Sequence, residues 1–189
     1  MTSPSIGLAL AIDRAVRKLC ICLWIVAAAC GRSRAPGVAM AQSSPQVILA
    51  TVFQDVAGDA MISTVAAKRG RLPETRELGA AMSKTLGDLR DDLARAAQRR
   101  NIALPKQMEE KKIALRDNLD MLPGQVFDRG YSLAMTQDTD SLLKKFDAAG
   151  SDPDLRNIAS KYRSAIEDQH RAADRLLSRL GGSPWPTAP

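Results

Sequence analysis

The sequence of 189 residues is long enough for one domain with a terminal extension, and its 45% apolar content permits a packed core. Aromatic residues make up only 4% of the chain, which favours helices packed through Ala and Leu over a β-sandwich rich in aromatic and β-branched side chains. The net charge of +6 does not indicate nucleic-acid binding, because residues 1–41 carry +4 of it and the later charges alternate in sign along helix faces without forming a phosphate-binding stripe.

The first part of the chain has the pattern of an export signal. Basic residues at 14–18 precede the apolar run 19–29, whose 11 residues are too few for a membrane span of about 20 but fit the apolar region of a signal peptide. The three cysteines, Cys20, Cys22 and Cys30, all lie here, so the chain after residue 30 can hold no disulfide, catalytic thiolate or cysteine-ligated zinc. The long stretch before the basic cluster leaves a translation start further downstream as an alternative.

Two processing sites compete at the end of this leader. The run Ala27–Gly31 resembles a lipobox, in which Cys30 would be lipidated and become the new N-terminus. Alternatively, Ala39-Met40-Ala41 before Gln42 has the small residues of an ordinary secretory cleavage site. We therefore expect residues 1–30 to be a signal peptide, a lipoprotein signal or an anchor helix, and the protein to be exported to the periplasm or anchored as a lipoprotein in the outer membrane.

Helices are predicted throughout the rest of the chain, since no segment alternates as a strand would. Residues 31–45 have the composition of a flexible tether, and residues 181–189 form a Pro-rich tail. Prolines at the expected helix starts and glycines after the ends mark the boundaries. The expected helices cover about 45–68, 73–101, 106–120, 124–149 and 152–180. Short connections between long helices imply antiparallel neighbours, so the expected fold is all-α, with an extra short helix beside a four-helix bundle over residues 46–180.

Each expected helix has apolar residues three or four positions apart, the pattern of a helix with one buried face. The expected core positions are Ile48, Val52, Val56, Ile62 and Ala66, then Leu78, Met82, Leu86, Leu89 and Leu93, then Ile113 and Leu119, then Phe127, Tyr131, Met135, Leu142 and Phe146, and finally Leu155, Ile158, Tyr162, Ile166, Gln169, Ala173 and Leu176.

A family resemblance rests on motifs in this helical part. The run Phe127-Asp128-Arg129-Gly130-Tyr131 resembles the Phe-Asp-Arg-Ala-Tyr signature of the DUF4142 family, a group of exported bacterial proteins. Pro73-Glu74, Leu104-Pro105 and Asp152-Pro153-Asp154-Leu155 stand where that family has corresponding features. The resemblance covers residues 46–178. It implies a ferritin-like four-helix bundle with an extra short helix, a periplasmic or outer-membrane address, and no settled activity.

This chain departs from the family in its polar residues. Many members carry Glu in the first helix and His in the other three long helices, a set that suits a metal site in a bundle core. The resemblance places Ala60 and Ile62 at the positions of the acids, and Leu86, Thr139 and Gln169 at those of the histidines. Leu cannot ligate a metal, and Thr and Gln are poor ligands for transition metals. We therefore predict no catalytic or cofactor-binding residue, and hypothesise a non-enzymatic envelope protein that binds a protein, lipid or wall component or has a structural or stress-related role.

A metal-binding protein or metal-dependent oxidase with a degenerate site is the alternative hypothesis. His170 is the only histidine, and Asp138 and Asp168 are its candidate partners. With one imidazole and no Glu-x-x-His pair, the more common role of such a residue is that of a surface histidine among helix-face charges.

Three further charged residues are expected to be structural. Asp59 lies on or near the inward stripe of the first helix, where it either faces solvent or pairs with a basic residue. Since a buried carboxylate must be paired, Arg129 is the expected partner in the second case. Alternatively, Asp128 and Arg129 cap or brace the helix that follows Pro123, since no nucleophile–base pair accompanies them.

Overall fold

Five helices form the part of the chain that the computed structural model describes, residues 45–148 and 152–181, and this part contains no strand. The helices are α1 (Pro45–Arg69), α2 (Pro73–Arg99), α3 (Glu110–Asp120), α4 (Gly124–Ala148) and α5 (Pro153–Arg179). They belong to a compact unit of residues 42–189. The predicted leader with Cys30, both predicted cleavage sites, the tether up to residue 44 and the tail from Gly182 lie outside the described residues.

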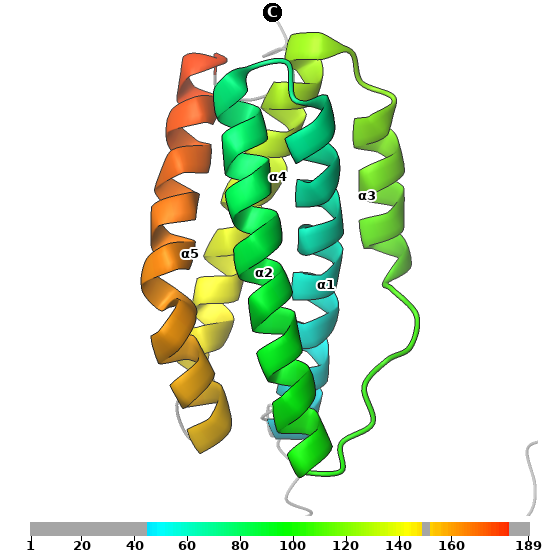
Figure 1. Ribbon diagram of the computed structural model, residues 1–189, viewed down its shortest axis with the longest axis vertical. Coiled ribbons are helices and arrows are strands. Elements are labelled where there is room, and N and C mark those ends of the chain that lie inside the picture. Colours follow the sequence, from blue (N-terminus) through cyan, green and yellow to red (C-terminus); the bar gives the residue numbers. More distant parts are fainter. Residues whose placement is uncertain (1–44, 149–151, 182–189) are drawn as a thin grey trace, which may run out of the picture. The chain divides into compact units, whose positions relative to one another are not determined.

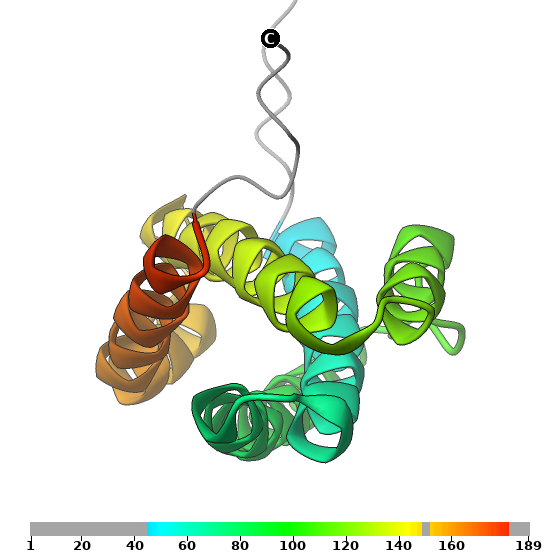
Figure 2. The same cartoon turned by 90° about the horizontal axis from the view of Figure 1, so that it is seen from above.

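The four long helices surround one core. Going around the bundle the order is α1, α2, α5, α4, and α3 packs outside against α1 and α4 (Figure 2). α1 and α2 form one antiparallel hairpin and α4 and α5 form another, and the segment containing α3 connects them along the length of the bundle (Figure 1). Two hairpins joined by one long crossover are the topology of ferritin-like bundles. The predicted all-α four-helix bundle with an extra short helix is therefore confirmed.

Two helices begin where their sequence signals predict. Pro73 and Pro153 stand at the start of α2 and α5, where the missing N–H of proline breaks no hydrogen bond. Asp152 caps α5, because its Oδ1 accepts hydrogen bonds from the backbone N–H groups of Asp154 at 3.0 Å and Leu155 at 3.1 Å. These local features fix where α2 and α5 begin, and these two helices line the groove described below.

The core consists of the predicted apolar stripes. Every predicted stripe residue of α2, α4 and α5 is buried. In α1 only Ile48 differs from the prediction, because it is half-buried and its neighbour Leu49 is buried instead. α1 and α2 approach each other closely at Gly79, where an added Cβ would lie 2.5 Å from the backbone nitrogen of Ala67 and 2.8 Å from the carbonyl oxygen of Ser63. The first hairpin therefore leaves no free space at this level.

α3 begins at Glu110, not at about Lys106 as predicted. The preceding residues run as a loop from the end of α2 to the outer side of α1 (Figure 1). Gln54 of α1 holds this loop by donating a hydrogen bond from its side-chain amide to the carbonyl oxygen of Gln107 at 3.3 Å. Extended chain covers about 3.3 Å per residue and a helix only about 1.5 Å, so a helix begun earlier would shorten the reach of this connection.

The face of α3 that meets the bundle carries a lysine. Leu119 is buried as predicted, but Ile113 is only half-buried and its neighbour Lys112 is buried instead. The lysine stem packs on Gly58 of α1, where an added Cβ would lie 2.6 Å from Cγ of Lys112. The glycine thus lets α3 bring a long charged side chain against α1.

Among the described residues, Gln46–Arg69 is the one helix that is long and apolar enough to cross a membrane. It contacts α2, α3 and α4. Two acidic residues on it, Asp55 and Asp59, are buried and form ion pairs with Lys145 and Lys112. We interpret it as the core helix of the bundle, whose apolar composition reflects contact with three neighbours.

Candidate functional site

The positions that the family resemblance assigns to metal ligands are filled by packing. Ile62 and Leu86 are each 1% exposed. Thr139 donates a hydrogen bond from Oγ1 to the carbonyl oxygen of Met135 at 2.5 Å within α4. Gln169 donates from Nε2 to Oγ1 of a threonine in α2 at 2.8 Å. None of these side chains offers an imidazole or a carboxylate to the bundle interior.

A small polar cluster lies in the core between α1, α2 and α4. The hydroxyl of Tyr131 donates to Oγ of Ser63 at 3.2 Å and lies 3.4 Å from the sulfur of Met82. The hydroxyl of Ser63 in turn lies 3.7 Å from the sulfur of Met135. Burial raises the pKa of Tyr131 well above its ordinary value, so the phenol stays neutral. Tyr131 is a core residue, as predicted.

The Phe127–Tyr131 motif joins α4 to two other parts of the bundle. The wholly buried carboxylate of Asp128 accepts hydrogen bonds from the backbone N–H groups of Arg71 at 2.9 Å and Leu72 at 3.1 Å, just before α2. Asp128 therefore braces the start of α2 and not its own helix, because the start of α4 lies beside the α1–α2 connection. Arg129 donates to the carbonyl oxygen of Gly181 at 3.3 Å, at the end of α5.

The three candidate metal ligands each have a separate partner. Nδ1 of His170 lies 2.9 Å from Oγ1 of Thr139 at hydrogen-bonding distance. Asp138 forms an ion pair with a lysine of α3 at 2.8 Å, and Asp168 with Arg171 at 2.5 Å. Within the described ranges, no group of three or more His, Cys, Asp or Glu side chains is placed to hold a metal ion. The structure thus does not bring the candidate set together.

A buried ion cluster connects α1, α3 and α4. Nζ of Lys112 lies 2.5 Å from Oδ1 of Asp59 and 2.8 Å from Oδ2 of Asp138, and the side chains of Lys112 and Asp59 are each 5% exposed. The predicted pairing of Asp59 with Arg129 is wrong. α3 brings Lys112 against this carboxylate, whereas Arg129 reaches toward the end of α5.

The charges of this cluster are unequal, with two carboxylates facing one ammonium group. Burial, helped by the charge of Asp138, raises the pKa of Asp59 to about 7 against the opposing effect of Lys112. Burial alone lowers the pKa of Lys112, but the two carboxylates outweigh it and raise that pKa above its ordinary value. The cluster therefore holds α3 against α1 and α4, and the buried carboxyl of Asp59 has a raised pKa because burial disfavours its charged form.

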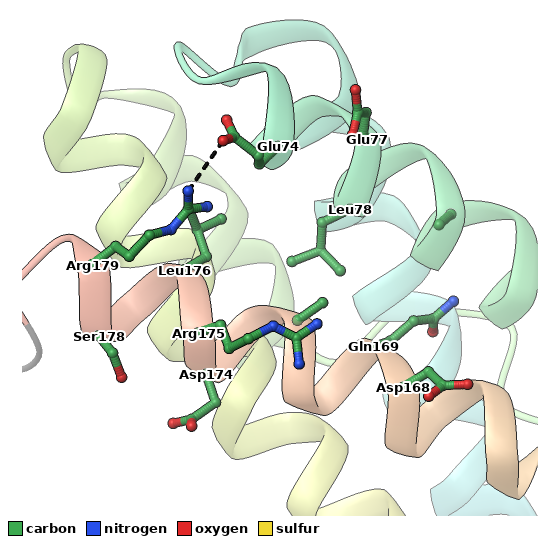
Figure 3. A pocket seen from close by; sticks show the side chains of 12 residues that line it. Glu74, Glu77, Leu78, Asp168, Gln169, Asp174, Arg175, Leu176, Ser178 and Arg179 are labelled. Carbon is green, nitrogen blue, oxygen red and sulfur yellow. Dashed lines mark hydrogen bonds and ion pairs between the residues drawn. The ribbon is translucent and has the colours of Figure 1, made fainter.

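A groove of about 850 Å³ runs between α2 and α5 (Figure 3). Leu78 and Ala81 of α2 and Ala172 and Leu176 of α5 give it an apolar surface. The two alanines are too short to fill the space between the hairpins, whereas within the first hairpin Gly79 allows direct helix contact. The groove is thus the consequence of small residues placed opposite each other.

Polar and charged groups border this groove, and some of them have partners. Glu74 and Arg179 form an ion pair of 3.1 Å across one end of it (Figure 3). The guanidinium of Arg175 extends over the groove and has no ion pair or hydrogen bond with any residue that the structure describes. Gln169 is 8% exposed, and its Oε1 has no hydrogen-bond partner in this part of the chain, although Nε2 donates to Thr85. The groove therefore has an apolar strip bordered by charged side chains, with the guanidinium of Arg175 and the carboxylates of Glu77, Asp168 and Asp174 among its lining.

The fold and the site define the protein as an all-α bundle with one crossover helix and a packed interior. The profile of the family described as Domain of unknown function (DUF4142) matches residues 31–176, and the chain belongs to this family. Searches of curated proteins and of solved structures gave no match.

Sequence reasoning missed two of the residues that the structure makes prominent. Lys112 lies seven positions before Leu119, two helical turns away on the same face, so periodicity contained a signal for its burial. Arg175 had no such signal, because a groove depends on the distance between two helices and not on the pattern within one of them.

Proposed function

We propose that this protein is a non-enzymatic component of the cell envelope that binds an apolar peptide segment of a partner protein in the groove between α2 and α5. The observation that carries the proposal is the apolar strip of Leu78, Ala81, Ala172 and Leu176 along the groove, with the guanidinium of Arg175 over it. Ligand sites typically combine such an apolar surface with a few polar groups.

The chemistry of the groove favours a peptide over a lipid acyl chain. A peptide backbone supplies an N–H donor at every residue except proline, whereas a hydrocarbon chain supplies none. The polar groups that border the apolar strip include Arg175 and the carboxylates of Glu77 and Asp174, and carboxylates accept hydrogen bonds from N–H donors.

A binding role also agrees with the contacts of the chemically active side chains. His170 is hydrogen-bonded to Thr139, and Asp59 is held against Lys112. Catalysis requires a nucleophile and a base in mutual reach beside a space for substrate. The groove surface instead presents alanine and leucine side chains bordered by charged groups of α2 and α5, such as Glu77, Asp174 and Arg175.

Photo-cross-linking at adjacent positions of α2 tests the binding role. Ala81 lines the groove, while Ala80 is exposed outside it, so the two positions form a matched pair. A photoreactive amino acid at position 81 of the full chain, in living cells, should link to an apolar peptide of another envelope protein, identified by mass spectrometry. The same amino acid at position 80 should not. Equal adducts at both positions, or none at position 81, would contradict the proposal.

The envelope address is a separate part of the proposal and has its own test. It is supported by the basic and apolar pattern of residues 14–29. Mass spectrometry of the mature N-terminus should find either a lipid adduct on Cys30 or a free N-terminus at Gln42. An unprocessed chain in the cytosolic fraction would contradict an envelope address.

A further inference from the structure

One side of the bundle already carries a short helix packed across two long ones. α3 lies against α1 and α4, and the order of the helices places the α2–α5 side opposite to it (Figure 2). Glycines make room where α3 packs: Gly58 of α1 receives the stem of Lys112, and an added Cβ at Gly130 of α4 would lie 2.9 Å from Cδ2 of Leu119. The fold thus packs a short helix over small residues of two neighbouring helices.

The α2–α5 groove has a similar surface. Its small residues are Ala81 of α2 and Ala172 of α5. Among the described residues, no helix covers this side of the bundle (Figure 2). The lining of α5 runs from Asp168 to Arg179, which is about 16.5 Å at the rise of an α-helix. The groove therefore has the length of a helix of 11 residues, which is the length of α3.

The apolar strip offers no hydrogen-bond partner to a peptide backbone. The backbone N–H and C=O groups of α2 and α5 are bonded within their own helices, and the side chains of the strip are alanine and leucine. An extended peptide pressed against this strip would bury N–H and C=O groups without partners, which is unfavourable. A helix satisfies these groups internally and presents only side chains. The strip therefore favours a helical ligand over an extended one.

The two sides of the groove differ in charge. The charged lining residues of α2 are both acidic, Glu74 and Glu77. From α5 the guanidinium of Arg175 extends over the groove, whereas the side chain of Asp174 is directed away from α2 (Figure 3). The other charged residues of the lining form ion pairs, Arg179 with Glu74 and Asp168 with Arg171. A helix in the groove would therefore meet carboxylates on one side and a guanidinium on the other.

We propose that the partner segment is a short amphipathic helix of about 11 residues at the rise of an α-helix, with basic residues beside its apolar stripe toward α2 and acidic residues toward α5. Its apolar stripe would lie on Ala81 and Ala172, as α3 lies on two glycines of α1 and α4. Its basic side chains would donate to Glu77, and its acidic ones would accept from Arg175. This inference rests on the proposed peptide-binding role of the groove and specifies the class of partner.

Three synthetic peptides with one leucine stripe test the inference on the full chain. The mixed peptide has lysines on one flank of the stripe and glutamates on the other, the basic peptide has lysines on both, and the acidic peptide has glutamates on both. At about 12 residues, such peptides are largely unfolded when free. By fluorescence anisotropy at low ionic strength, the mixed peptide should bind about threefold more tightly than either other peptide. Its ¹³Cα chemical shifts should become helical on binding. Equal affinities, or extended-chain shifts in the complex, would overturn the proposal.

Protein variants locate the binding and its charge preference. Arg175→Glu makes both sides of the groove acidic, so the basic peptide should become the tightest ligand. Arg156→Glu makes the same charge change at an exposed position of α5 outside the groove and should keep the wild-type order. Ala81→Gln places a polar side chain on the apolar strip and should weaken all three peptides, whereas Ala80→Gln should not. Circular dichroism confirms that each variant is folded. An unchanged order of affinities in Arg175→Glu would show that the proposal is wrong.

The outcomes also separate this inference from the proposed function. A partner adduct at position 81 in cells, together with peptide affinities that do not depend on charge, would refute the helical partner of mixed charge and support partner binding. Helical binding with the expected order of affinities, but without any adduct in cells, would support the inferred ligand class of the groove and refute an envelope partner.

Discussion

Lys112 is the residue whose burial differs most from what the apolar pattern of the sequence predicts. It is a lysine on the buried face of α3, with 5% of its side chain exposed. Its stem uses the space that Gly58 leaves on α1, and its ammonium group reaches Asp59 and Asp138. Removing one partner of a buried ion pair leaves an uncompensated charge, which is usually more costly than replacing the whole pair by apolar residues.

Lys112→Met should therefore lower the free energy of unfolding by about 3–5 kcal/mol. Methionine keeps an unbranched stem beside Gly58 but leaves Asp59 and Asp138 without their ammonium partner. Urea unfolding at about pH 9, where Asp59 of the wild-type protein with its pKa of about 7 is ionised, measures the effect. The exposed neighbour Lys111 is the matched control, and Lys111→Met should change stability by no more than about 0.5 kcal/mol. Equal stability of the two variants would show that the buried cluster contributes nothing.

At the scale of elements, the contact between α1 and α2 depends on one glycine. An added Cβ at Gly79 would meet backbone atoms of α1 at 2.5–2.9 Å, and a backbone cannot move aside as the end of a side chain can. Gly87 lies two turns further along α2, and nothing lies within 4 Å of its Cβ position. Replacing each glycine by alanine thus separates two effects on stability. Both positions gain helix propensity, but only position 79 disturbs the close contact between α1 and α2.

Gly87→Ala should stabilise the protein by about 0.5–1 kcal/mol, because alanine restricts the unfolded chain and favours a helix. Gly79→Ala has the same advantage but forces α1 and α2 apart, so it should destabilise by about 1–3 kcal/mol. Thermal unfolding of both variants gives the sign of each effect. Stabilisation by Gly79→Ala would mean that the two helices do not pack as closely as described.

A second contact between elements runs through Asp128 of α4. Its carboxylate accepts the two backbone N–H groups at the start of α2, and the residue is wholly buried. Asp128→Ala should cost about 2–4 kcal/mol, since hydrogen bonds to a charged group are strong and the donors would lose their acceptor. Hydrogen exchange at the amides of Arg71 and Leu72 should become faster.

The control for this variant is Asp120→Ala, which removes an exposed carboxylate paired with Arg69. Exposed ion pairs contribute about 0–1 kcal/mol, so this change should be small. Exchange at Arg71 and Leu72 that stays slow in Asp128→Ala would contradict the bracing role of the carboxylate.

The elements also show how far the sequence alone predicts the structure. Periodicity and caps predicted the four long helices and nearly all their buried positions, because these depend on interactions within one helix. The start of α3 was placed too early, since the length of the connection depends on where the next helix docks. For the same reason the partner of Asp59 was misassigned. The pattern predicts which face is buried but not which neighbour covers it, and the α2–α5 groove likewise depends on the spacing of two helices.

At the scale of the whole molecule, the buried cluster contributes to how stability depends on pH. Burial raises the pKa of Asp59 from its ordinary 3.8 to about 7, so the folded protein binds this proton more tightly than the unfolded chain. The associated stability is fully present below about pH 4 and is lost as the pH rises through 7. Carboxylates with a lowered pKa act in the opposite direction: hydrogen bonds from Lys161 and Tyr162 stabilise the charged form of Asp92, and that contribution is lost only in acid.

The free energy of unfolding of the wild-type protein, relative to Asp59→Asn, should therefore decrease as the pH rises from about 4.5 to 7.5. Asparagine cannot titrate, so the variant lacks the part of the slope that comes from this proton. Urea unfolding at several pH values measures both proteins. Asp140→Asn, which removes an exposed carboxylate paired with Lys144, should keep the wild-type slope. Parallel curves for wild type and Asp59→Asn would show that Asp59 is ionised across this range and that Lys112 stabilises its charge more than burial opposes it.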